Sequence, residues 1–106
     1  MNANFADRLA AAIRQKDSCV CVGLDPRLDL LPPTRATEPL ARVEEFCCAL
    51  CEATAPYAVA VKPQSAYFEA LAPEGLACLW RVIRYARRQG LLVVVDAKRN
   101  DIGSTA

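Results

Sequence analysis

The stretch LLVVVDAKRNDIGSTA, residues 91–106, decides how the chain is expected to fold. Its opening apolar run follows Gly90 and is closed by a charge, which is typical of a strand buried on both faces in a parallel sheet. Side chains alternate along an extended chain, so Asp96 and Lys98 should point to the same side. Asp101 adds a carboxylate just beyond. Taken alone, the pattern is also compatible with a solvated ion pair, although opposite charges at a buried strand end carry a large desolvation cost.

The residues before this strand alternate between helix and strand patterns. Asn4 can cap a first helix, and Pro73 suits the first turn of a third helix that ends before Gly90. Pro63 is expected to stop ladder pairing after the second strand, because proline has no N–H to donate. Helices are predicted over residues 4–16, 38–54 and 73–88, and strands over residues 18–24, 58–61 and 91–95.

Each predicted helix carries an apolar stripe that should face the rest of the protein. On the opposite side of the third helix, Arg81, Arg84 and Arg88 recur at helical spacing, and this basic row is expected to be solvated. The strand and helix alternation predicts an α/β fold with a parallel sheet and right-handed crossovers. The stripes comprise Phe5, Leu9, Ala12 and Ile13 in the first helix, Leu40, Val43, Cys47, Leu50, Cys51 and Thr54 in the second, and Leu76, Leu79, Trp80 and Ile83 in the third.

An ionisable residue follows each of the predicted strands at once. Asp25 follows the first strand, Lys62 the second, and Asp96 with Lys98 the third. In parallel α/β folds these strand ends share one rim, where active sites are built. Because the charges alternate in sign, we expect them to form one charge network.

Composition narrows the classes of function. The net charge of +1 gives no electrostatic footprint for nucleic acid, and no apolar run reaches the length of a membrane span. The sequence has six cysteines and no histidine, so Cys48 and Cys51 lack the partners of a zinc site, and the cysteines are expected to be buried as small apolar side chains. With no secretory signal at the N-terminus, a reducing cytoplasm is the expected compartment.

Three motifs resemble one enzyme family over essentially the whole chain. They are VGLDPR at residues 22–27, VKPQSAYFE at residues 61–69, and DAKRNDIGST at residues 96–105. Their order and separation resemble orotidine 5'-phosphate decarboxylase in its longer form. The resemblance implies a TIM (β/α)8 barrel that forms a homodimer without metal or organic cofactor. It further implies conversion of orotidine 5'-monophosphate to UMP and carbon dioxide, the last step of de novo pyrimidine synthesis.

The resemblance also implies roles for individual residues. Asp25 would bind a ribose hydroxyl, and Lys62 would order the charges and contact the ribose. Asp96 would lie beside the substrate carboxylate, and Lys98 would protonate the carbon left behind. The remaining residues would act at the partner subunit's site: Asp101 would reach that site, and Ile102 and Thr105 would line it.

The length of the chain departs from the family. A TIM barrel needs about 250 residues and eight strands, so residues 1–106 are expected to form the N-terminal portion of one barrel domain, with about three strands, and to be inactive alone. A magnesium-dependent sugar-phosphate decarboxylase or hexulose-phosphate synthase of the same superfamily is an alternative. A non-catalytic remnant, or a half-barrel that serves as an interaction module, is another.

Overall fold

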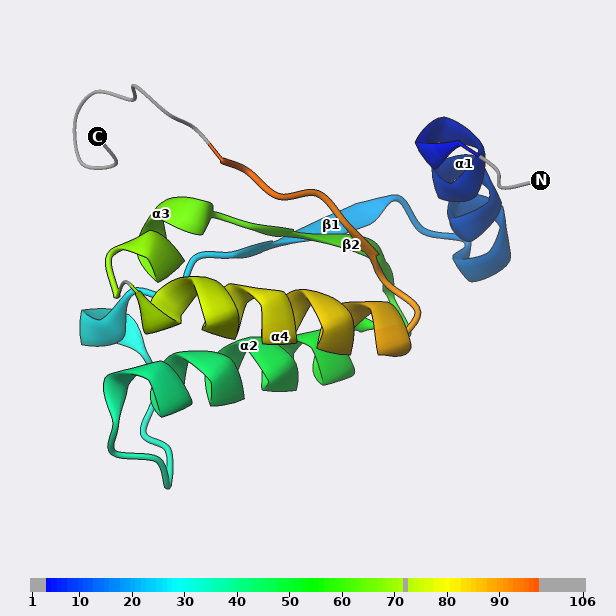
Figure 1. Cartoon of the computed structure of the whole chain (residues 1–106). Coiled ribbons are helices and arrows are strands. Elements are labelled where there is room, and N and C mark those ends of the chain that lie inside the picture. The colour runs from blue at the N-terminus through cyan, green and yellow to red at the C-terminus, as the bar shows by residue number, and fades with distance from the viewer. Residues whose placement is uncertain (1–3, 72, 98–106) are drawn as a thin grey trace.

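The computed structural model describes residues 4–71 and 73–97. It confirms the predicted α/β class: three parallel strands alternate with helices, as in part of a TIM barrel, and the described strands do not close a barrel (Figure 1). The elements are α1 (Phe5–Lys16), β1 (Val20–Leu24), a 3-10 turn (Leu28–Leu30), α2 (Pro39–Thr54), β2 (Ala58–Pro63), α3 (Ser65–Glu69), α4 (Glu74–Arg88) and β3 (Leu92–Val93).

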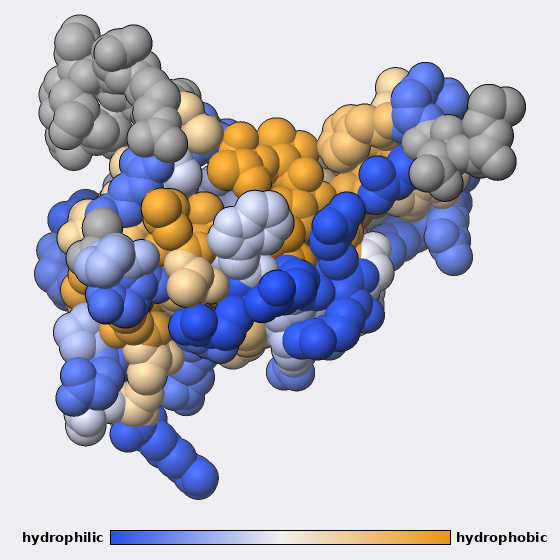
Figure 2. Space-filling model, viewed as in Figure 1, coloured by the Kyte–Doolittle hydropathy of each residue, from blue (hydrophilic) through white to orange (hydrophobic). Residues whose placement is uncertain are grey.

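The strands lie in the order β1-β2-β3, so β2 is central. Helices α2 and α4 run side by side across one face of the sheet, as Figure 1 shows. No described helix covers the opposite face, which we call the inner face. β3 is shorter than the predicted strand over residues 91–95, and this apolar run is not buried on both faces, since Val94 and Val95 are each 41% exposed. Figure 2 shows apolar residues gathered at the surface over this part of the sheet.

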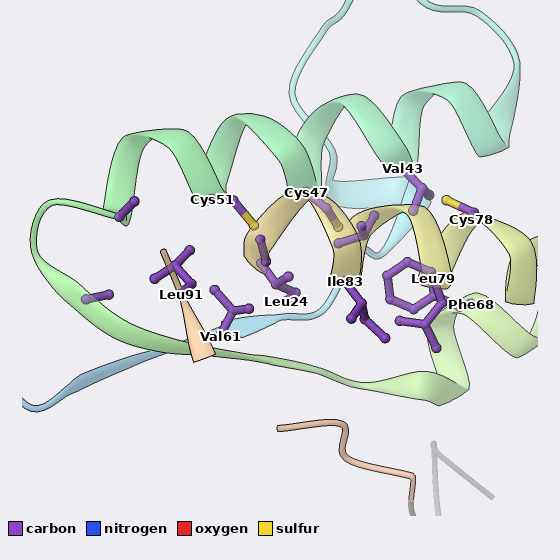
Figure 3. Packing of buried hydrophobic residues seen from close by; sticks show 14 residues of the cluster. Leu24, Val43, Cys47, Cys51, Val61, Phe68, Cys78, Leu79, Ile83 and Leu91 are labelled. Carbon is purple, nitrogen blue, oxygen red and sulfur yellow. The ribbon is translucent and has the colours of Figure 1, made fainter. Parts of the chain in front are cut away.

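The core fills the space between the sheet and the two covering helices (Figure 3). Leu24 and Val61 point from the strands towards the helices, and Phe68 from α3 packs beside Leu79 of α4. Val43 of α2 is fully buried in the same cluster. Burying a side chain of this size contributes about 1.5–3 kcal/mol, so this face of the sheet carries most of the stabilisation.

Two further predictions about burial are right only in part, since Leu79 and Ile83 of the predicted α4 stripe and three of the six cysteines are buried. Leu76 and Trp80 were expected on the apolar face of α4, but they are 46% and 60% exposed; Cys78, Val82 and Ala86 are buried instead. The cause is that the helix turns a different stripe towards α2 and the sheet. The expectation that the cysteines are buried holds for Cys47, Cys51 and Cys78, whereas Cys48 is half-buried and Cys19 and Cys21 are exposed on or beside the uncovered sheet.

Helix α1 lies at the opposite end of the strands from α3 (Figure 1). Its start follows the prediction, because the Asn4 side chain accepts a hydrogen bond from the N–H of Asp7. No residue of α1 is buried. The Lys16 ammonium instead donates to the carbonyls of Ala55 (2.8 Å), Ala58 (2.9 Å) and Gly90 (3.3 Å). Among the described residues, no helix is both long and apolar enough to cross a membrane.

Candidate active site

Ionisable residues from all three strand ends lie on the inner face, at the carboxyl edge of the sheet. Side chains alternate along a strand, and Leu24 and Val61 face the helices, so the residue after each faces the other way. Those residues are Asp25 and Lys62, and Asp96 is paired with Gln64, two residues beyond Lys62. Because Leu24 is paired with Pro63, the same register places Asp25, Gln64 and Asp96 in one row across the three strands. Lys62 lies on the same face as this row, two residues before Gln64.

The first carboxylate lies over a glycine. A Cβ built on Gly23 would be 3.8 Å from Oδ2 and 4.0 Å from Oδ1 of Asp25, so the carboxylate folds back over this position. Gly23 is paired with Lys62 in the neighbouring strand. Since neighbouring strands lie about 4.8 Å apart, the carboxylate and the lysine stem share one region of the inner face.

Backbone hydrogen bonds fix the register of the three strands at their carboxyl ends. The N–H of Gln64 donates to the carbonyl of Leu24 (3.1 Å), which ties β2 to β1. The N–H of Asp96 donates to the carbonyl of Pro63 (2.9 Å), and the carbonyl of Asp96 accepts from the N–H of Ser65 (3.0 Å). The prediction that Pro63 stops pairing is therefore wrong, because proline keeps its carbonyl as an acceptor and β2 extends through it.

The charges at this edge are open to water in the described part of the chain. Asp25 and Lys62 are exposed, Asp96 is half-buried, and no ion pair joins Asp25 to Lys62. Exposed charges interact weakly, so Asp25 and Lys62 share this edge without a closed ion pair between them. The other predicted site residues, Lys98, Asp101, Ile102 and Thr105, lie outside the described residues.

Sequence reasoning missed Gln64, which lies between the two carboxylates of the row. Its side chain is only 8% exposed, although Lys62 on the same face is exposed. The signal was present, because the spacing of Lys62 and Gln64 is the same as that of Asp96 and Lys98 and places both side chains on one face.

The pockets and cysteine clusters of the described residues do not include the ionisable residues of this edge. A hollow of about 210 Å³ beside it is lined by Arg27 and Tyr67, among others, and by neither Lys62 nor Asp96. Within residues 4–71 and 73–97, no group of histidine, cysteine and acidic side chains is arranged to hold a metal ion. Burial raises the pKa of Cys51 and Cys78 to about 11, so these thiols are protonated and unreactive near neutral pH.

Parallel strands with helices on the outer face and ionisable residues at the carboxyl edge are features of the TIM-barrel class of folds. Residues 18–106 match the model of the orotidine 5'-phosphate decarboxylase / HUMPS family, and the chain belongs to this family.

Curated relatives are similar over nearly the whole chain. It is 46% identical over 110 residues to the orotidine 5'-phosphate decarboxylase of Rhodopirellula baltica, a match that covers 96% of this chain and 36% of the relative. Its identity to the enzyme of that name from a Nocardioides species is also 46%, over 102 residues, with coverage of 96% and 37%. The chain therefore spans about a third of the length of these relatives.

Solved structures agree with this match. A putative orotidine 5'-phosphate decarboxylase from Streptomyces avermitilis superposes with a TM-score of 0.80 at 40% identity, over 99% of this chain and 37% of that one. The UMP synthase of Leishmania donovani superposes with a TM-score of 0.74 at 42% identity, over 95% of this chain and 20% of that one.

Proposed function

We propose that residues 1–106 are the first part of an orotidine 5'-phosphate decarboxylase, which converts orotidine 5'-monophosphate to UMP and carbon dioxide. The observation that supports this most directly is the meeting of Asp25, Lys62 and Asp96 at one edge of the sheet. Each belongs to a different one of the three family motifs, and the relatives from Rhodopirellula baltica and the Nocardioides species bear this enzyme's name.

The residue types suit the chemistry. Loss of carbon dioxide from the pyrimidine ring leaves a localised carbanion, which a fixed ammonium can stabilise and then protonate. Lys98 supplies that ammonium and donates its proton to the carbon. Asp96 lies beside the departing carboxylate, where repulsion between like charges favours its loss. Lys62 holds the charges in order, and Asp25 accepts a hydrogen bond from a ribose hydroxyl.

The proposal includes a homodimer with shared sites. Asp101 enters the site of the partner subunit, and Ile102 and Thr105 line that site. Mixing inactive Lys98→Ala protein with inactive Asp101→Ala protein should restore activity, because a mixed dimer contains one site with both residues intact. If subunit exchange is confirmed and no activity returns, Asp101 acts within its own subunit.

The function is tested on the protein expressed from its complete gene. We expect it to form UMP from orotidine 5'-monophosphate, to keep its rate in excess EDTA, and to lose at least about a hundredfold of that rate in Lys98→Ala. The alternative, a sugar-phosphate enzyme of the same superfamily, would lose its activity in EDTA and regain it with magnesium. Turnover of Lys98→Ala within tenfold of wild type would contradict the role of Lys98.

Residues 1–106 alone are proposed to be inactive. The described strands leave the inner face without an opposite wall, and the chain spans about a third of its relatives. Binding energy from groups remote from the reacting carbon would then be missing. UMP formation by the isolated 106-residue chain, above a Lys98→Ala control, would contradict this part of the proposal.

A further inference from the structure

Gln64 is the one uncharged residue of the row formed by Asp25, Gln64 and Asp96. With its amide oriented so that both ends find partners, Nε2 donates to Oδ2 of Asp96 at 3.0 Å and to the backbone carbonyl of Asp96 at 3.1 Å. The side chain is 8% exposed, so these hydrogen bonds are shielded from competing water.

Two features make this contact suited to orientation. The amide grips Asp96 at two points, one on the carboxylate and one on the main chain, so the side chain is held relative to the backbone. The backbone of Gln64 is itself fixed to β1 through the carbonyl of Leu24. The Asp96 carboxylate, which follows β3, is therefore held relative to β2 and, through β2, to β1.

The charge of the residue at position 64 matters as much as its shape. A neutral donor stabilises the Asp96 carboxylate without adding a positive charge that would offset its repulsion of a second carboxylate. A glutamate at this position would instead place a second negative charge against the Asp96 carboxylate, to which the amide now donates.

We propose that Gln64 is a positioning residue, which orients the Asp96 carboxylate for the reaction. This inference rests on the proposed decarboxylase function. A misoriented Asp96 would act less effectively on the substrate carboxylate in the transition state. Loss of the Gln64 amide should therefore lower kcat and leave KM little changed.

The test uses the protein from its complete gene and three variants. Gln64→Met keeps the length of the side chain without its donor, and we expect kcat to fall about tenfold or more with KM within about threefold. Gln64→Glu keeps the shape of the side chain but adds a negative charge, so its kcat should fall further than that of Gln64→Met. Gln15→Met makes the same change on the exposed surface of α1 and should match wild type.

The outcomes separate the two proposals. An inactive wild-type protein contradicts the decarboxylase function, whereas an active one with both Gln64 variants within twofold of its kcat overturns the role of Gln64. The backbone hydrogen bonds of Gln64 and Ser65 do not need the amide, so Gln64→Met should keep the thermal midpoint of wild type within a few degrees. If Gln64→Met unfolds, the nearly isosteric Gln64→Glu decides the question.

Discussion

Two glycines differ in the space that a side chain would meet. A Cβ on Gly75 would lie 1.8 Å from the carbonyl oxygen and 2.8 Å from the carbonyl carbon of Phe68. A Cβ on Gly23 would meet only the Asp25 carboxylate, at ordinary contact distance. Gly75 is therefore required for the close approach of α4 to the end of α3, whereas Gly23 tolerates a methyl group.

Gly75→Ala is expected to destabilise the protein by about 1–3 kcal/mol or more, because a backbone carbonyl cannot move aside as a side chain end can. Thermal unfolding of the protein from its complete gene measures the effect. Gly23→Ala is the matched control and should shift the midpoint by much less. Equal midpoints for Gly75→Ala and wild type would show that α3 can move away from α4 at little cost.

Single residues also show how far the sequence could define the site. Asp25, Lys62 and Asp96 could be predicted to share an edge, because each follows an apolar run and strands in a parallel sheet end together. The spacing from Lys62 could have placed Gln64 on the same face, but its contact with Asp96 and the close approach at Gly75 could not be predicted, because both depend on partners in other elements. Those partners are set by strand register and helix approach, which no local pattern encodes.

At the scale of elements, the long helices and the alternation with strands could be predicted, whereas the short elements could not. Helix α3 spans Ser65–Glu69, too short for an apolar period to be recognised. β3 has the opposite problem: its apolar run is long, but only Leu92 and Val93 are paired, both with β2. Strand length depends on the neighbours available, and the described chain offers β3 a neighbour on one side only.

Lys16 is predicted to hold α1 in place. Its ammonium meets the carbonyls of Ala55 and Gly90, which lie just past the C-terminal ends of α2 and α4, where helix dipoles favour a positive charge. Lys16→Met should lower the free energy of unfolding by about 1–3 kcal/mol and leave these carbonyls without a charged partner. Hydrogen exchange should become faster across α1.

Arg14→Met is the control for this experiment. Arg14 is exposed in the same last turn of α1 and makes none of these contacts, so its loss should leave exchange across the helix unchanged. Equal exchange in the two variants would mean that α1 is held by other contacts, such as the hydrogen bond from the Ser18 hydroxyl to the carbonyl of Tyr57 just after the helix.

At the scale of the whole molecule, the two faces of the sheet are unequal. The outer face is closed by α2 and α4 and contains the buried core, whereas the inner face carries the charged edge and is not covered by any described element (Figures 1 and 3). The relatives are nearly three times longer than this chain. We therefore expect further strand and helix units of the complete protein to cover the inner face.

The six cysteines allow that expectation to be measured, since they are distributed between the two faces. In the isolated 106-residue chain at pH 8, an alkylating reagent should modify Cys19 and Cys21, which are exposed. Cys47, Cys51 and Cys78 should stay unmodified, because burial raises their pKa and excludes the reagent. Their protection also verifies that the isolated chain is folded.

In the protein from the complete gene, Cys21 should become protected while the buried thiols stay as they were. Side chains alternate between the two faces along β1, and those of Val22 and Leu24 face the helices. The side chain of Cys21 therefore lies on the inner face, which a closed barrel would cover. Mass spectrometry after timed alkylation gives the rate at each cysteine, and we expect that of Cys21 to fall by at least about tenfold when a second layer excludes the reagent. An unchanged rate at Cys21, with Cys47 protected in both proteins, would show that the inner face stays open and would contradict the proposal that residues 1–106 belong to a closed barrel.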